Sequence, residues 1–539
     1  MSVSLTKART LVVDDFQGMR TILRDIVRAM GVTHVDTAAN GREALNLLRG
    51  SHYDVVICDF NLGPGLNGQQ VLDEARLHDY IGVSSIWVMV TAEKTAEMVM
   101  GAAEVKPDEY LLKPINQSIL ESRLERLIVK KQALRGIEEA IKAKDYAAAI
   151  DRCDQLIHAE PAKHPEILRI KSDLQLKVGD YDGAKALFES ILAARSVPWA
   201  RTGLGKVYFH KGEYDNARNT FQQVLDENRM FIEASDWLAK TFEALGERAR
   251  AQQVLLDAVK LSPNSASRQK VLGETAHKNG DLGVAQAAFE RTIKISEFSS
   301  NKNPTAYVAL AKVLSESDAP DEALKVLART KGVFKDSTDV AIQAAAVESA
   351  VYRKTGQQDL SDAAMAQAEQ LLASQPGKLS QDAAIEVAQA MLALGRKDQA
   401  FGLMRDLVKN HHEDTQLSNK VEELFEQAQM GAEGRSLIAE SREEVIQINN
   451  QGVMLAKQGQ FAEGARLLRT ALQNLPGNEV VMMNLCGLLI GQMRAEGKSD
   501  ALMSEVMELL ERVRELNPLN EKARQYMSVL HPSGGRGHG

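Results

Sequence analysis

The segment Asp54-Val55-Val56-Ile57-Cys58-Asp59 is a short apolar run between two acids. Its middle residues are apolar and mostly β-branched, which is typical of a strand that is buried on both faces of a parallel sheet. Such a strand delivers its last residue to a loop at the carboxyl edge of the sheet. The loop-like sequence Phe60-Asn61-Leu62-Gly63-Pro64-Gly65 follows at once. We therefore expect the Asp59 carboxylate to stand at that edge, where other groups can reach it.

Strands and helices alternate on both sides of this segment. Besides the strand before Asp59, a buried strand is predicted at residues 9–13, a weaker strand at 34–38, and further strands at 85–90 and 108–112. Helices are predicted at residues 18–30, 42–48, 69–77 and 95–103, and from residue 117 onward. A strand followed by a helix, five times over, predicts an α/β fold with a doubly wound, five-stranded parallel sheet that has helices on both faces.

Polar residues end four of the predicted strands. Asp14 and Asp15 follow the first strand, Asp59 ends the third, Thr91 ends the fourth and Lys113 follows the fifth. Because these ends share one edge of the sheet, three carboxylates crowd together and repel one another. Mg²⁺ is a suitable counter-ion, since it takes hard oxygen ligands and keeps waters that a phosphate can replace.

The same set of groups suits phosphoryl transfer, which needs positioning and charge neutralisation above all. Lys113 is expected to pair with Asp59 and later with phosphoryl oxygens, to which Thr91 can donate its hydroxyl. We therefore interpret Asp59 as the residue that takes up a phosphoryl group.

These residues resemble a known family, the receiver domains of two-component response regulators. The resemblance rests on Val13-Asp14-Asp15, the strand-terminal Asp59, Thr91-Ala92 and Lys113-Pro114. It implies a flavodoxin-like sheet and Asp59 as the phosphoacceptor, with a histidine kinase or phosphotransfer protein as donor. It also implies that Asp14, Asp15, Asp59 and the backbone carbonyl of Asn61 hold Mg²⁺.

The resemblance further implies a switch made by the hydroxyl of Thr91 and the aromatic ring of Tyr110. Lys113-Pro114 often forms a cis peptide in this family. One departure is visible, because the loop from Leu62 to Gly68 is one residue longer than the family's usual form.

A second pattern begins after residue 125, at steps of 33 to 35 residues. A small residue recurs at Ala149, Ala184, Ala217, Ala251 and Ala285. Glycine precedes it by five residues in four copies, and Phe or Leu follows it by four. Glycine suits the turn between two helices, and the small residue lets the helices approach. Such helix pairs must stack on their neighbours to bury their apolar faces.

This pattern resembles the tetratricopeptide repeat. Its best copy contains Leu204, Gly205, Tyr208, Gly212, Tyr214, Ala217 and Phe221. The match weakens between about residues 300 and 440 and recovers from Gly452. The resemblance implies an all-α superhelix with a concave groove that binds a protein or peptide. The residues it places in that groove are Trp199, Lys206, Phe209, His210, Lys240 and Glu243. His411 and His412 have no metal-ligand spacing and are expected at the surface.

The predicted organisation is a receiver domain over 1–125, a repeat array over 126–530 and a disordered tail over 531–539. Residues 117–133 read as one helical run without a Gly- or Pro-rich linker, so a stiff joint is expected between the two parts. Receivers often pair and repeat arrays often self-associate, so a homodimer is compatible with this organisation.

Composition narrows the function further. The chain has 539 residues, 44% hydrophobic content, a net charge of −8 and three well-separated cysteines. No broad basic region suggests nucleic-acid binding. No apolar run approaches the roughly 20 residues that span a bilayer, and no signal peptide pattern is present. We therefore expect a cytoplasmic protein with neither nucleic acid nor membrane as partner.

The interpretation favoured by the sequence is a response regulator whose phosphorylation at Asp59 switches protein binding by the repeats. A constitutive scaffold that uses its receiver only for docking or dimerisation is the alternative. A DNA-binding output lacks a basic recognition helix. An enzymatic output lacks a catalytic constellation after residue 125, although the divergent stretch could hide one, so we predict that the chain is not an enzyme.

Overall fold

The computed structural model describes residues 8–92, 106–159, 165–299, 302–374, 379–517 and 520–530. The chain forms two compact units, residues 1–313 and 314–539. The helix predicted at 95–103 and the tail predicted at 531–539 lie outside the described residues. The domain boundaries predicted at residues 125 and 530 remain predictions.

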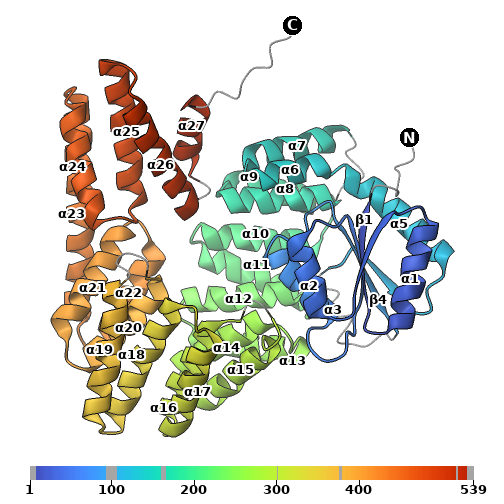
Figure 1. Ribbon diagram of the computed structural model, residues 1–539, viewed down its shortest axis with the longest axis horizontal. Helices are drawn as coiled ribbons and strands as arrows, with labels where there is room; N and C mark the ends of the chain where they lie inside the picture. Colours follow the sequence, from blue (N-terminus) through green and yellow to red (C-terminus); the bar gives the residue numbers. More distant parts are fainter. Residues whose placement is uncertain are drawn as a thin grey trace. The chain divides into compact units, whose positions relative to one another are not determined.

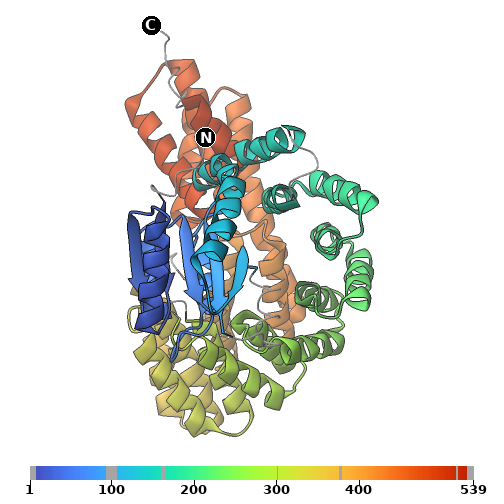
Figure 2. The ribbon, with the colours of Figure 1, turned by 90° about the vertical axis from the view of Figure 1, so that its right-hand side faces the viewer.

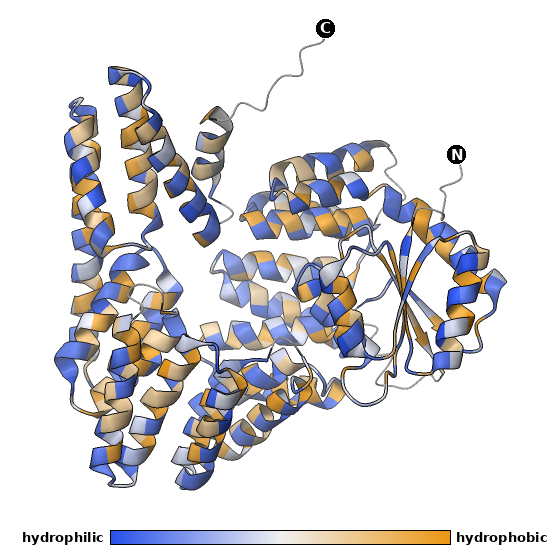
Figure 3. Ribbon diagram, in the orientation of Figure 1, coloured by the Kyte–Doolittle hydropathy of each residue, from blue (hydrophilic) through white to orange (hydrophobic). Residues whose placement is uncertain are grey.

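The sheet of the first unit has the predicted parallel architecture. Its strands are β1 (Arg9–Val13), β2 (His34–Ala38), β3 (Val55–Asp59), β4 (Ile86–Thr91) and β5 (Glu109–Leu112). The spatial order is β2-β1-β3-β4-β5, and every neighbouring pair is parallel. All residues of β3 are buried, as its apolar run predicts. The central strands are accordingly among the most hydrophobic elements of this fold (Figure 3).

Helices cover both faces of the sheet (Figure 1). They are α1 (Gln17–Ala29), α2 (Gly41–Gly50), α3 (Gly68–Leu77) and α5 (Gln117–Gln132). Helices α2 and α3 bury one apolar face of the sheet, and α1 and α5 bury the other. Asn67 begins α3 with a capping box, in which its side chain and that of Gln70 each bond the other's backbone N–H. This cap fixes the start of α3 directly after the Asp59 loop.

A helical array follows within the first unit and curves from pair to pair (Figure 2). Its helices are α6 (Arg135–Lys142), α7 (Tyr146–Ala159), α8 (Pro165–Val178), α9 (Tyr181–Ala194), α10 (Pro198–His210), α11 (Tyr214–Glu227), α12 (Ile232–Ala244), α13 (Arg248–Leu261), α14 (Ala266–Lys278), α15 (Leu282–Ile295) and α16 (Pro304–Glu316), which crosses the unit boundary. The recurring Phe188, Phe221 and Phe289 are at most 1% exposed. Each such ring contributes about 1.5–3 kcal/mol by burial.

In the described residues, the second unit is helical throughout. Its helices are α17 (Pro320–Val333), α18 (Thr338–Lys354), α19 (Gln358–Ser374), α20 (Gln381–Ala393), α21 (Lys397–Asn410), α22 (Thr415–Gln427), α23 (Gly431–Lys457), α24 (Phe461–Asn474), α25 (Glu479–Glu496), α26 (Asp500–Leu516) and α27 (Glu521–Leu530). No helix in the described part of the chain is long and apolar enough to cross a membrane.

One backbone conformation marks the repeats along both units. A residue in the left-handed region, with φ between 56° and 77°, stands before ten of the helices from α7 to α24, each time at the turn between two paired helices. The glycines at this position are Gly179, Gly212, Gly246, Gly280, Gly356, Gly395 and Gly459. Lys144, Asp318 and Gln429 take the same place in copies without glycine. The divergent stretch is therefore built from the same helix pairs as the clear repeats.

The surface position predicted for His411 and His412 is wrong for His412, which is only 8% exposed. Its Nδ1 lies 3.1 Å from Asn478 Nδ2. The Asn478 amide oxygen accepts the N–H of Val481 at the start of α25, so its amino group is the part that faces His412. Because Asn478 Nδ2 is a hydrogen-bond donor, the His412 Nδ1 that faces it must carry no proton in order to accept. Burial is the largest effect and lowers the pKa of His412, Glu413 opposes it in part, and Arg442 adds to the lowering.

A pH dependence follows for this histidine. Its folded-state pKa lies below the ordinary value of 6.5, so the stability it contributes is complete above that value and is lost as pH falls below it. Urea melts between pH 7.5 and 5.5 are expected to show a smaller loss of stability for His412→Gln than for the wild type. The exposed His52→Gln is the matched control and should follow the wild-type slope. Parallel slopes for all three proteins contradict this account.

Candidate functional site

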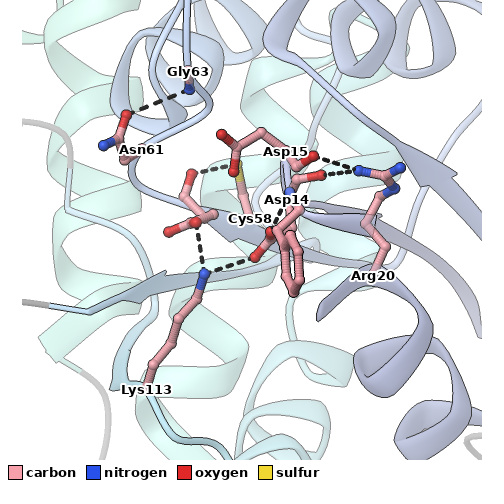
Figure 4. A network of polar contacts seen from close by, with 9 residues as sticks. Asp14, Asp15, Arg20, Cys58, Asn61, Gly63 and Lys113 are labelled. Atoms are coloured by element: carbon pink, nitrogen blue, oxygen red, sulfur yellow. Dashed lines mark hydrogen bonds and ion pairs between the residues drawn. The ribbon is translucent and has the colours of Figure 1, made fainter. Parts of the chain in front are cut away.

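Three carboxylates and one ammonium meet at the carboxyl edge of the sheet (Figure 4). Carboxylate oxygens of Asp14, Asp15 and Asp59 all lie within 4.8 Å of one another. Asp14 is 0% exposed and Asp59 is 6% exposed, whereas Asp15 is open to solvent. The parallel register of β1 and β3 brings the first and third acids together, as the sequence predicts.

Lys113 Nζ lies between two of these acids. It donates to Asp59 Oδ2 at 2.7 Å and to Asp14 Oδ2 at 2.8 Å. The pairing with Asp59 confirms the prediction, and the pairing with Asp14 was not predicted. One ammonium thus holds the ends of β1, β3 and β5 together, and the Lys113-Pro114 peptide behind it is cis.

The pKa of the Asp59 carboxyl is affected by its burial and by the neighbouring carboxylate of Asp14. Burial raises the pKa of this carboxyl, and the nearby Asp14 raises it further. Lys113 and the backbone N–H of Asn61 oppose both effects, and the net pKa lies above the ordinary value. For Lys113, burial acts to lower the pKa, but its two acid partners raise it overall. An additional cation at this edge is therefore electrostatically favoured.

Backbone contacts hold the loops around these acids. Arg20 Nη1 donates to the carbonyl oxygens of Asp14 and Asp15, at 2.7 and 3.0 Å. The Cys58 thiol donates to the Asp59 carbonyl at 3.3 Å. A Cβ on Gly68 would lie 2.1 Å from that carbonyl oxygen, so only glycine allows α3 to begin so close to Asp59. Arg20 and Gly68 were not singled out in the sequence, because no motif marks them.

The two proposed switch residues lie on neighbouring strands. Thr91 ends β4, is 6% exposed, and its carbonyl accepts the Lys113 N–H at 2.8 Å. The hydroxyl of Tyr110 on β5 is buried without a hydrogen-bond partner among the described residues. Burial raises the pKa of Tyr110 to about 12. Because the Tyr110 hydroxyl makes no hydrogen bond among the described residues, the side chain can move without losing one.

Most residues predicted in the repeat groove surround one aromatic residue, Trp237, which the sequence analysis missed. Lys206 and Lys240 place their ammonium groups 5.4 and 4.5 Å from its ring centroid. The rings of Phe209 and His210 meet its edge. Trp237 holds the helix position that Gly203 has one repeat earlier, so an alignment of the copies could have found it.

The other two predicted groove residues make separate contacts. Trp199 packs edge-on against Phe188, and the Arg169 guanidinium lies 4.8 Å from its ring centroid. Glu243 accepts a hydrogen bond from Thr275 of the next repeat. These two side chains are therefore engaged within the array itself.

Two family models match the chain, the response regulator receiver domain over residues 10–125 and the tetratricopeptide repeat over residues 176–236. The chemotaxis protein CheY of Pseudomonas aeruginosa is 30% identical over 119 residues, which cover 22% of this chain and 94% of that protein. A chemotaxis protein CheY-3 of Vibrio cholerae is also 30% identical, over 90% of its length.

Two solved structures are also similar to portions of the chain. A Vibrio cholerae CheY4 structure is 30% identical and covers 22% of this chain and 98% of its own, with a TM-score of 0.21. The crystal structure of MamA is 22% identical and covers 32% of this chain and 95% of its own, with a TM-score of 0.29. The receiver-family model and the CheY relatives show that the chain belongs to the response regulator receiver family, and the second family model matches a tetratricopeptide repeat after the receiver domain, at residues 176–236.

Proposed function

We propose that this protein is a phosphorylation-dependent response regulator whose output is protein binding by its repeats. The observation that carries the proposal is the bridge from Lys113 to Asp14 and Asp59, within a complete set of acids. The phosphoryl donor is a histidine kinase or a phosphotransfer protein. In the described residues the receiver is followed by helix pairs, and this architecture directs the proposal to a binding switch.

The chemistry at Asp59 requires little of the protein beyond placement and charge. A carboxylate oxygen of Asp59 forms a bond to phosphorus while the donor's phosphorus–nitrogen bond breaks and its imidazole takes the electron pair. Lys113 stays within reach of the new phosphoryl oxygens, and the Thr91 hydroxyl and Tyr110 ring are the proposed switch. The added charge of roughly −1.5 to −2 acts on all three.

The donor set at the sheet edge fits Mg²⁺. Asp14, Asp15, Asp59 and the backbone carbonyl of Asn61 are the proposed ligands, all hard oxygen donors. Bound Mg²⁺ supplies charge neutralisation for the phosphoryl oxygens. The three cysteines are free and buried, which is compatible with the cytoplasmic location that we propose.

The proposal is tested by labelling and by partner capture. Acetyl phosphate with Mg²⁺ is expected to add one phosphoryl group that base or hydroxylamine removes, read by intact mass, to the wild type but not to Asp59→Asn. Beryllofluoride with Mg²⁺ should change the affinity of a captured partner by about fivefold or more. Asp25→Asn, an exposed acid of α1, is the matched control. Equal partner affinity in treated wild type, untreated wild type and Asp59→Asn leaves only the scaffold alternative.

A further inference from the structure

Lys106 is a receiver residue that contacts the repeat array within the first unit. Its Nζ lies 3.7 Å from Glu233 Oε2 at the start of α12. The same ammonium lies 5.8 Å from the centroid of the Phe231 ring. The backbone of Lys106 is left-handed, with φ at 47°, and its carbonyl accepts a bond from Arg76 Nη2 at 3.0 Å. Arg76 of helix α3 thus holds the backbone of Lys106 itself.

Glu233 offers one carboxylate oxygen to the repeats and one to the receiver. Its Oε1 accepts from Lys206 Nζ at 2.6 Å, and Lys206 in turn lies over Trp237. Burial alone acts to raise the pKa of Glu233, but Lys206 and Lys106 hold it below its ordinary value. Glu233 is therefore an ionised acid whose two lysine partners each lie near an aromatic ring, Lys206 near Trp237 and Lys106 near Phe231. Such a site suits an ammonium or guanidinium group.

A second contact joins the same part of the receiver to the array. On α3, Gln70 Nε2 lies 3.5 Å from the Ile295 carbonyl, and Glu74 Oε2 accepts from Ser299 Oγ at 2.7 Å. A cavity of about 510 Å³ separates α3 from α14 and α15. Because α3 begins against Asp59 and also holds Lys106 in place, it connects the acid site with both contacts.

We propose that Lys106 is a tethered ligand of the repeat groove, and that a partner protein enters by presenting a lysine or arginine to Glu233 in its place. The proposal rests on the groove function proposed above but not on phosphorylation. A tethered ligand competes at an effective concentration of about millimolar. A partly exposed ion pair is weak, so a partner with several contacts can displace it. The receiver thereby selects for partners that are basic at this point.

The test follows the reactivity of the Lys106 amine in the full-length protein. An amine-acetylating reagent is applied, and the rate at Lys106 is read by peptide mass spectrometry. The probe is an N-acetylated peptide of alternating arginine and alanine, which has no amine of its own. Saturating probe is expected to raise the Lys106 rate about two- to fivefold. Lys260, an exposed lysine of α13, is the internal reference and should not change.

Two variants make the outcome decisive. Glu233→Gln is expected to raise the Lys106 rate without any probe and to remove the probe's effect, while Glu227→Gln, an acid of the neighbouring α11, behaves as wild type. An unchanged rate in Glu233→Gln shows that Glu233 does not hold Lys106. If the Lys106 rate rises in Glu233→Gln but the probe has no effect on the wild type, then the contact is a fixed part of the packing between receiver and repeats, and a basic partner does not displace it. An equal effect of a matching glutamate peptide removes the charge selectivity, and each of these three results overturns the proposal.

Phosphorylation does not enter this experiment. It is carried out without Mg²⁺ or phosphoryl donor, and Asp59→Asn is expected to give the wild-type result. A failure of phosphoryl labelling at Asp59 therefore leaves this inference standing. Loss of the Lys106 contact leaves the labelling prediction standing.

Discussion

Replacing Lys131 by methionine is expected to destabilise the first unit by about 3 kcal/mol. Lys131 Nζ donates to Asp108 Oδ1 at 2.8 Å, to Glu166 Oε1 at 2.7 Å and to the Val83 carbonyl at 3.0 Å. Its side chain is only 8% exposed. Burial acts to lower the pKa of Lys131, but the two acids raise it overall, so the ammonium is charged. Methionine keeps the length of the side chain and leaves two shielded carboxylates without their common partner.

The neighbouring Lys130 provides a matched control for this variant. It contacts the other oxygen of Glu166 at 2.6 Å, but its side chain is 50% exposed. Lys130→Met is therefore expected to cost less than about 1 kcal/mol. Urea melts followed by tryptophan fluorescence measure both effects. Hydrogen exchange at the start of α8 should rise only in Lys131→Met, because this lysine joins Asp108, the residue before β5, to Glu166 in the first turn of α8. Equal destabilisation by the two variants contradicts the assigned role.

The joint around Lys131 also shows what the sequence could predict about domain coupling. A continuous helical run from Gln117 predicts a stiff connection, and α5 does end only two residues before α6 begins. The stiffness comes from contacts that the helical pattern does not contain. Arg135 pairs with Asp54 at the start of β3, and Glu138 accepts the Ser84 N–H at 2.7 Å. These partners are more than 50 residues apart in the chain, so local periodicity carries no information about them.

The acid site was predictable because strand order alone brings its members together. Each acid follows an apolar run, and parallel strands end at one edge. The choice of partners within the site was less predictable. Lys113 binds Asp14 as well as Asp59, since the buried Asp14 carboxylate turns toward it while Asp15 faces solvent. Which of two adjacent acids turns inward depends on the contacts of both residues, here the bonds from Arg20 and from the Phe16 N–H.

The repeats were predictable only where their period stayed near 34 residues. In the second unit, α18 and α19 have 17 residues each, and the turn positions Asp318, Gly356 and Gly395 are 38 to 39 residues apart. A search for a fixed period fails at such copies. Asp318 and Gln429 also occupy turns where glycine was expected. The left-handed backbone survives there because a full helix pair on each side compensates its modest cost.

The contact between Lys106 and Glu233 could not be predicted from the sequence, for a different reason. Glu233 lies in the first turn of α12, where an acid is ordinarily explained by the helix dipole alone. Only the three-dimensional arrangement brings a receiver lysine to it. The predicted groove residues were chosen from the repeat pattern. That pattern contains information about contacts between repeats and none about contacts with the receiver. The contact of Lys106 with Glu233 is therefore visible only in the three-dimensional structure, and the groove ligand proposed above rests on it.

Mg²⁺ at one hundred times its dissociation constant is expected to stabilise the wild-type receiver by about 2.7 kcal/mol. Three carboxylates converge within 4.8 Å, and the Lys113 ammonium pairs with only two of them, so an added dication relieves their repulsion in the folded state only. Asp59→Asn removes one ligand and one charge. In metal-free buffer it is expected to melt above the wild type, and with Mg²⁺ the order should reverse. Calorimetric titration gives the dissociation constant, thermal melts give the stability, and Asp25→Asn should follow the wild type in both. An equal gain from Mg²⁺ in Asp59→Asn rules out this carboxylate as a ligand.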